Sequence, residues 1–101
     1  MESFAVGNKI ATIPVIQGGM GVGVSRSSLA GAVAREGGIG IISTAQIGYD
    51  EPDFCDNYQE SNIRAIKKHI SLAKEQADGG LVGVNEMVAL IVYVEHVRTA
   101  A

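Results

Sequence analysis

The chain has 101 residues, 47% of them hydrophobic, and a formal net charge of −3 at pH 7. This much apolar sequence excludes a disordered polymer, and the acidic balance with scattered lysines and arginines excludes a basic surface for nucleic acid or anionic membranes. The single cysteine excludes an internal disulfide. Because the N-terminus is unlike a signal peptide and no apolar run is long enough to span a bilayer, we expect a cytoplasmic protein.

The chain begins with two short apolar pieces, Phe4 to Ile10, around Gly7-Asn8, a pair suited to a tight hairpin turn. A poorly tied N-terminal arm is an equally good interpretation of these residues. The next segment, Ile13 to Gln17, is apolar on both faces, as expected of a buried strand in a parallel sheet covered by helices. Pro14 lacks a ladder donor and therefore fits best near the start of this strand.

A glycine-rich loop follows Gln17, with glycine at positions 18, 19, 21 and 23. Because glycine has no Cβ, such a loop lets backbone N–H groups approach a flat or anionic ligand. The spacing does not fit a dinucleotide fingerprint, and the chain contains no Gly-Lys pair for a P-loop. Ser25, Ser27 or Ser28 can cap the helix that follows. Strand, glycine loop and helix N-terminus together are the unit at which α/β proteins place ligands.

The next elements predict a crossover between two strands. A helix is expected from about Ser27 to Glu36, ended by Gly37-Gly38, and a buried strand from Ile39 to Ser43. Such crossovers are right-handed and join parallel strands. Ser43 and Thr44 then lie at the carboxyl end of the strand, the ligand side, although ordinary loop hydrogen bonding is the commoner role for such residues.

An acidic stretch, Gly48 to Tyr58, predicts a long solvated surface loop, because its carboxylates lack the spacing of a calcium-binding loop. Cys55 in this loop is expected to be exposed, and with no histidine near it in sequence it is not assigned a catalytic role. Isoleucine and alanine recurring at helical spacing predict a helix from about Glu60 to Ala77. His69 borders the apolar face of this helix, which favours a surface or packing role over catalysis.

The third main strand, Leu81 to Asn85, brings a carboxamide to the strand end that also carries Gln17, where it can donate to and accept from a ligand. A last helix starts at Tyr93, and His96 within it is expected on the helix surface. Strands that are apolar on both faces and have open edges predict that the isolated chain self-associates or stays molten. The apolar end from Met87 to Val94 adds to this tendency.

Three stretches, IPVIQGGMGVGVS, LAGAVAREGGIGIIST and GLVGVN, occur in this order and together resemble the nitronate monooxygenase family, formerly called 2-nitropropane dioxygenases, and the related flavin-dependent enoyl-ACP reductases. Known members are FMN-containing (β/α)8 TIM barrels, which need roughly 250 residues. The resemblance therefore implies an α/β fold with three strand–helix units, the N-terminal part of such a barrel, over residues 1–101.

The resemblance also implies FMN as the cofactor, with Gly19, Met20 and Gly21 along the flavin ring and Asn85 at its edge. Met20 can alternatively be core filler, the usual role of a lone methionine. Glu86 departs from the family pattern, in which this position is usually apolar, and we expect its carboxylate close to the flavin.

The activity implied is FMN-dependent oxidation of an alkyl nitronate by dioxygen, with reduction of an enoyl thioester as the alternative from the related enzymes. The family's catalytic histidine and phosphate-binding loops belong to later segments. No catalytic or metal-binding residue is therefore assigned, neither His69 nor His96 takes the catalytic role, and the chain alone is expected to be inactive. A non-catalytic fragment or interaction piece that needs a second chain, and a small independent ligand-binding module, are the other two interpretations.

Overall fold

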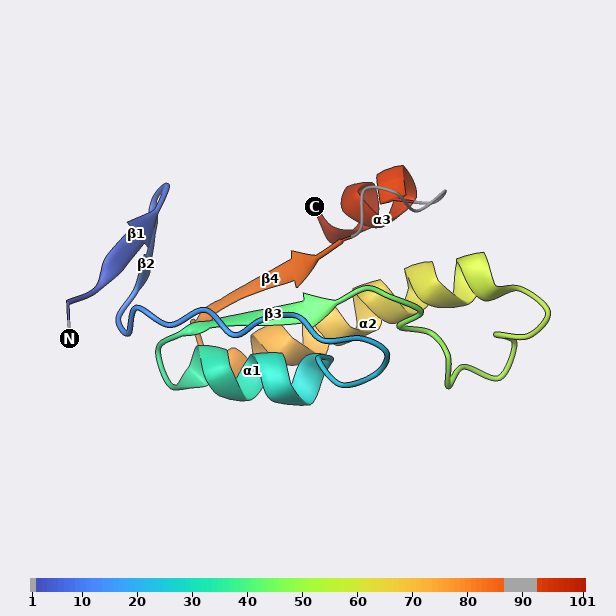
Figure 1. Cartoon of the computed structure of the whole chain (residues 1–101), viewed down its shortest axis with the longest axis horizontal. Helices are drawn as coiled ribbons and strands as arrows, with labels where there is room; N and C mark the ends of the chain where they lie inside the picture. Colours follow the sequence, from blue (N-terminus) through green and yellow to red (C-terminus); the bar gives the residue numbers. More distant parts are fainter. Residues whose placement is uncertain (1, 87–92) are drawn as a thin grey trace.

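The structure is a computed structural model that describes residues 2–86 and 93–101. Its elements follow in the order β1 (Phe4–Val6), β2 (Lys9–Ala11), α1 (Ser27–Arg35), β3 (Ile39–Ser43), α2 (Tyr58–Ala77), β4 (Leu81–Asn85) and α3 (Tyr93–Ala100). The predicted hairpin is confirmed, because β1 and β2 pair antiparallel and Gly7 turns the chain with a φ of +62°. Figure 1 shows the hairpin beside the end of the sheet at which β3 and β4 begin.

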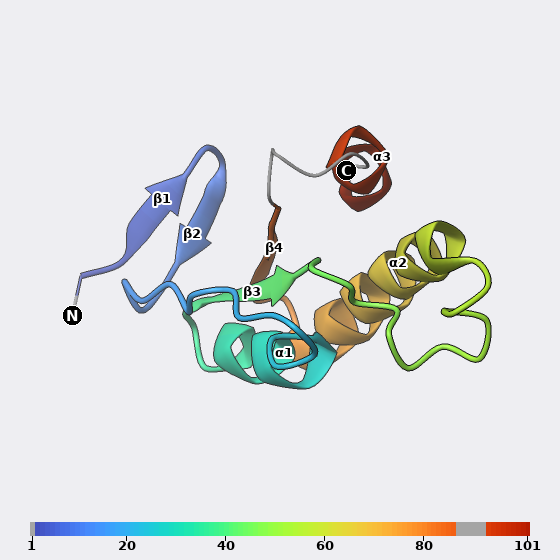
Figure 2. The ribbon, with the colours of Figure 1, turned by 45° about the vertical axis from the view of Figure 1, so that its right-hand side comes forward.

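β3 and β4 pair in parallel along their whole length, and their bounds are those expected from the sequence. Ile39 lies opposite Leu81 and Ser43 lies opposite Asn85, so the two strands end together. α1 and α2 run side by side along this pair, as Figures 1 and 2 show from two directions. The chain is therefore an α/β protein with a parallel strand–helix–strand unit.

The strand predicted at Ile13–Gln17 is not continuous in the structure, and this prediction is corrected. The segment runs along β3, but only an isolated parallel bridge forms, between Ile16 and Ile39. The main chain turns tightly at Pro14, because the N–H of Val15 donates to the carbonyl two residues before it at 2.8 Å. Pro14 has no N–H of its own for a ladder. The proline thus acts at the start of the segment and prevents a regular strand.

Side chains of β3 and β4 alternate between two faces of the sheet. The helix face packs on α1 and α2, and the core between them comprises Ala30, Ile42, Ile47, Ala65, Ile66 and Ala73, with Ile70, Val82, Val84 and Ala100 packed against it. The opposite side is the open face, which carries Ile39, Ile41, Ser43, Leu81, Gly83 and Asn85. It is this open face that meets the glycine loop.

α1 crosses the sheet at close range because glycine faces it from two positions. A Cβ on Gly40 of β3 would overlap the carbonyl oxygen of Ala30, and a Cβ on Gly80 would overlap that of Ala34. No side chain other than hydrogen fits at these positions without moving the helix. The close crossing places the N-terminus of α1, and with it the end of the glycine loop, beside the carboxyl end of β3.

Two arginines hold down the acidic loop, which consists of successive turns. Arg26 bonds Asp50 at 2.9 Å, and this hydrogen bond lowers the pKa of the Asp50 carboxyl. Arg64 of α2 pairs with Asp53 and with Glu51. Among the described residues, no group of three or more His, Cys, Asp or Glu side chains is placed to hold a metal ion.

The helices agree closely with their predicted bounds. α2 begins at Tyr58, slightly before the expected Glu60, and ends at Ala77 as expected; Asp78 then takes a left-handed φ of +48°. Cys55 is exposed, as predicted. No helix in the described ranges is long and apolar enough to cross a membrane. Residues 87–92, most of the apolar end considered above, lie outside the described residues.

Candidate functional site

The glycine loop lies directly on the carboxyl ends of β3 and β4. A Cβ on Gly19 would stand 2.7 Å from the Asn85 Cβ, and a Cβ on Gly21 would stand 2.9 Å from the Ala45 Cβ. Both distances are shorter than real side chains tolerate, so the loop needs glycine at both positions to lie this close. The structure therefore brings three of the four predicted cofactor-binding residues together, and the fourth, Met20, lies between two of them in sequence. Their contact with a flavin stays a prediction.

The glycine loop and the carboxyl ends of β3 and β4 together form one surface, called the wall below. Met20 and Asn85 are both exposed on it. Met20 is 48% exposed, so it does not fill the core of the described fold. Asn85 is exposed too, and its carboxamide forms no hydrogen bond with any residue that the structure describes. Its main-chain carbonyl accepts the Thr44 N–H at 3.2 Å, which fixes the backbone at the strand end. An amide with a fixed backbone and an unbonded side chain is suited to ligand recognition.

Gln17 and Ser25 hold the loop in place. The Gln17 side chain accepts the Ile41 N–H at 2.9 Å and donates to the Gly18 carbonyl at 2.6 Å and to the Ser25 hydroxyl at 3.0 Å. The same hydroxyl accepts the Met20 N–H at 2.9 Å. The sequence places Gln17 among the polar groups at the strand ends and offers Ser25 as a possible helix cap; in the structure, the side chains of both residues bond the loop.

The N-terminus of α1 is not capped by a serine side chain, so that expectation was wrong. His69 of α2 takes this place: its Nδ1 accepts the Ser27 N–H at 3.4 Å and lies 3.0 Å from the Ser27 hydroxyl. His69 is buried, and of its two predicted roles the packing role is confirmed. Burial lowers the pKa of the imidazole, and the charges of Arg26 and Lys68 act in the same direction. A helix N-terminus likewise disfavours a cation.

His96 was expected on the helix surface, and that prediction was wrong. It is 2% exposed, and its Nδ1 lies 2.9 Å from a carboxylate oxygen of Glu86, with the imidazole donating. The same oxygen accepts the Thr44 hydroxyl at 2.6 Å. Glu86 follows Asn85 directly and therefore points to the opposite side, the helix face, as Val84 does. Its carboxylate does not lie beside the glycine loop, which corrects the expectation that it would approach a flavin.

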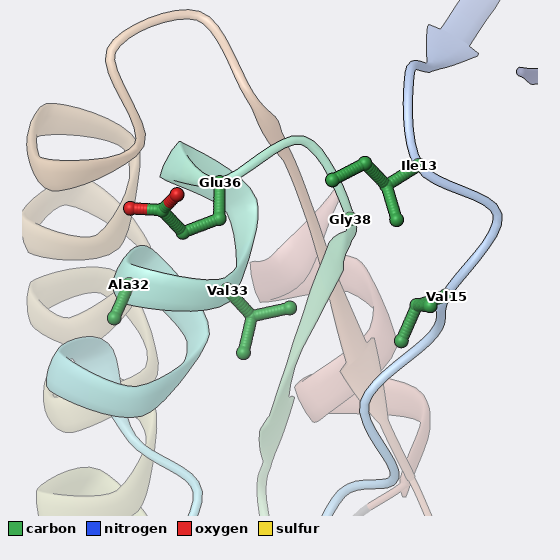
Figure 3. Close-up of a pocket in the computed structure, with 6 residues that line it drawn as sticks. All are labelled: Ile13, Val15, Ala32, Val33, Glu36 and Gly38. Atoms are coloured by element: carbon green, nitrogen blue, oxygen red, sulfur yellow. The ribbon is translucent and has the colours of Figure 1, made fainter. Parts of the chain in front are cut away.

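An apolar hollow of about 340 Å³ lies at the opposite end of β3. Figure 3 shows Val33 of α1 pointing toward Ile13 and Val15, while the Glu36 carboxylate points away from them. Gly38 closes the hollow just before β3 begins. Apart from Glu36, the described residues that line it are apolar, so they do not supply the converging polar groups that orient a substrate. The glycine loop remains the candidate site.

The fold and this wall define a parallel α/β protein that offers a glycine loop and polar strand ends to a ligand. A family model for nitronate monooxygenase matches residues 5–73, more than half of the chain. The chain belongs to the nitronate monooxygenase family, as the resemblance had indicated. A search of curated proteins finds no match to the chain. The matched range contains Gly19, Met20 and Gly21 and ends before Asn85, so the asparagine rests on its own geometry.

Proposed function

We propose that the glycine loop and the ends of β3 and β4 form one wall of an FMN site, in an enzyme that oxidises alkyl nitronates with dioxygen. The described units would then be the first units of a TIM-type barrel. Membership of the nitronate monooxygenase family supports the chemistry. The observation that carries the proposal is the contact of Gly19 with Asn85, because it joins a flat, side-chain-free loop to an unbonded carboxamide.

The residues of this wall fit a flavin ring. The N–H groups of Gly21, Val22 and Gly23 have no acceptor among the described residues, so they are available to ring oxygens or nitrogens. Asn85 can donate to or accept from the polar edge of the ring. Glycine at positions 19 and 21 leaves the face of the loop free of side chains. A flat heterocycle with a polar edge is the ligand that such a surface complements.

The wall carries no charge, and this property suits the proposed chemistry. Bound FMN would supply the redox chemistry between the nitronate and dioxygen. The residues of this chain have the task of orienting the ring through neutral groups: the amides of the loop, the Met20 side chain and the Asn85 carboxamide. Glu86 is the nearest carboxylate in sequence, and it is bonded to Thr44 and His96 on the helix face. The Glu86 carboxylate is thus held away from the wall.

Two alanine substitutions in the same loop test the proposal. A Cβ on Gly19 would meet Asn85 at 2.7 Å, whereas a Cβ on Gly18 has nothing within 4 Å. Titration of the chain with FMN, followed by flavin fluorescence, should show Gly19→Ala binding about tenfold more weakly than the unaltered chain. Gly18→Ala should stay within about twofold. Riboflavin should bind as tightly as FMN, because the proposed contacts are to the ring.

The proposal fails if the unaltered chain shows no saturable binding of either flavin up to millimolar concentration. It fails equally if the Gly18 and Gly19 variants lose the same affinity. Hydrogen exchange measured by mass spectrometry gives the location: flavin should protect peptides covering residues 17–25 and 81–86. Protection confined to peptides that line the apolar hollow would place the ligand at the other end of the sheet.

A further inference from the structure

We infer that Gln17 and Ser25 are positioning residues for the flavin: their hydrogen bonds set the shape of the loop from residue 18 to residue 24, and this shape sets the affinity for the ring. The inference rests on the proposed function for its ligand. Its structural part, that the two side chains fix the loop, stands on contacts within the chain and is tested separately below.

Main-chain pairing with β3 ends at Gln17, because the Gln17 side-chain oxygen takes the place of its main-chain carbonyl as the next acceptor. The Gln17 N–H still donates to the Ile39 carbonyl at 3.0 Å, in the pattern of a parallel ladder. The next donor along β3, the Ile41 N–H, is met by the side-chain oxygen of Gln17 at 2.9 Å. The main chain at Gly18 is therefore released from the sheet edge without leaving an unpaired donor on β3. This release lets the loop cross over the strand ends.

Ser25 closes the loop at its other end. Its N–H donates to the Met20 carbonyl at 2.8 Å, and its hydroxyl accepts the Met20 N–H at 2.9 Å, so residues 20–25 form a closed turn. The Ser25 carbonyl also accepts the Ser43 N–H at 2.8 Å, which attaches this turn to β3. The Ser25 side chain is fully buried and accepts from both Met20 and Gln17. Both acceptor positions of a hydroxyl are thereby used.

The hydrogen bonds of Gln17 and Ser25 to the loop are called the brace below. They matter for binding because a glycine-rich loop loses much conformational freedom when it is ordered. A ligand that must order the loop itself binds more weakly than one that meets an ordered loop. Gln17 and Ser25 order the loop before the ligand arrives, without touching the exposed surface that the ligand would cover. Their substitution should therefore weaken flavin binding while leaving the ring contacts themselves in place.

Gln17→Glu tests the brace with a substitution of nearly the same shape. The introduced carboxylate can still accept from Ile41, but it cannot donate to the Gly18 carbonyl, which lies 2.6 Å from the present amide nitrogen. Two acceptors would then face each other. At pH 8 the variant should bind FMN about tenfold more weakly than the unaltered chain. At pH 5 this ratio should fall toward one, because the facing Gly18 carbonyl favours the protonated form of the half-buried carboxyl, which can donate again.

Ser25→Ala and Ser28→Ala form the matched pair for the other half of the brace. Ser28 is exposed in the first turn of α1, so its loss should leave FMN affinity unchanged, while Ser25→Ala should lower it about tenfold. Circular dichroism shows whether Ser25→Ala remains folded. If it does not, the test of the inference is the pH dependence of the FMN affinity of Gln17→Glu relative to the unaltered chain.

Hydrogen exchange without FMN tests whether Gln17 and Ser25 order the loop, separately from whether the loop binds FMN. Relative to the unaltered chain at the same pH, Gln17→Glu should exchange faster in peptides covering residues 17–25 at pH 8 and at the same rate at pH 5. Absence of FMN binding together with this exchange pattern would refute the proposed function but not the brace. FMN binding of Gln17→Glu that equals the unaltered chain at pH 8, or that is weaker by the same factor at both pH values, would overturn the inference.

Discussion

Replacing His96 with leucine should destabilise the fold strongly, because it removes the imidazole that donates to the Glu86 carboxylate. The side chains of the pair are only 2% and 9% exposed, so water cannot easily replace the lost partner. Breaking a buried pair by removing one member costs about 3–5 kcal/mol. For a domain of this size each kcal/mol lowers Tm by roughly 4–8 °C, so His96→Leu should lower Tm by more than about 12 °C.

The double variant Glu86→Leu/His96→Leu should recover most of this loss, because an apolar pair of similar volume needs no partner. Exchange of a buried pair of ionisable groups for apolar residues is often neutral or stabilising. We expect the double variant to lie within about 1 kcal/mol of the unaltered chain, measured by urea unfolding at one fixed low protein concentration. Glu95→Gln, an exposed neighbour of His96 on α3, is the control and should change stability by less than about 0.5 kcal/mol. Equal losses in the single and double variants would show that the pair does not carry the stability.

Three further predictions follow from the described contacts. The pKa of His69 is lower in the folded chain than in the unfolded chain, so the unfolded chain binds more protons as the pH falls below 6.5. The stability that neutral His69 contributes is therefore present above pH 6.5 and is lost below it. Urea midpoints should drop from pH 7 to pH 5, and His69→Gln should flatten this drop. The purified 101-residue chain should leave gel filtration colourless, since Arg26 is bonded to Asp50 and the wall offers FMN only ring contacts; a stoichiometric yellow band would contradict this. The chain should self-associate through its open face and exposed Val15, Ile16 and Met20, and light scattering that shows a monomer at low micromolar concentration would exclude it.

The regular elements were predictable because their signals are local. β3 and β4 are short apolar runs that each follow a glycine pair, and α2 repeats isoleucine and alanine at helical spacing, so their existence and bounds needed no tertiary information. The segment 13–17 was misjudged because its apolar residues outweighed Pro14. Whether a proline ends a strand or merely starts one depends on the hydrogen bonds its neighbours find.

The errors at the site have a different cause. His96 has no partner nearby in sequence, and its bond to Glu86 exists only because α3, which packs against α2, brings the imidazole to the residue that follows β4. His69 likewise meets Ser27 across two helices. The direction of Glu86, by contrast, was available from the sequence: it follows an asparagine assigned to one face of a strand, and alternation sends the next side chain to the other face. The period of two contained that information, whereas the resemblance to a flavin site indicated the opposite face.

The alternation at the end of β4 has a consequence for how this family can vary. Asn85 and Glu86 are neighbours in the chain, yet one faces the glycine loop and the other faces Thr44 and His96. Among the described residues, positions 44 and 96 therefore constrain substitutions at position 86, and position 85 does not. Among related sequences, an acidic residue at 86 should occur with a hydrogen-bond donor at 96 and a hydroxyl at 44, and an apolar residue at 86 should occur with apolar residues at both, while the asparagine varies independently of all three.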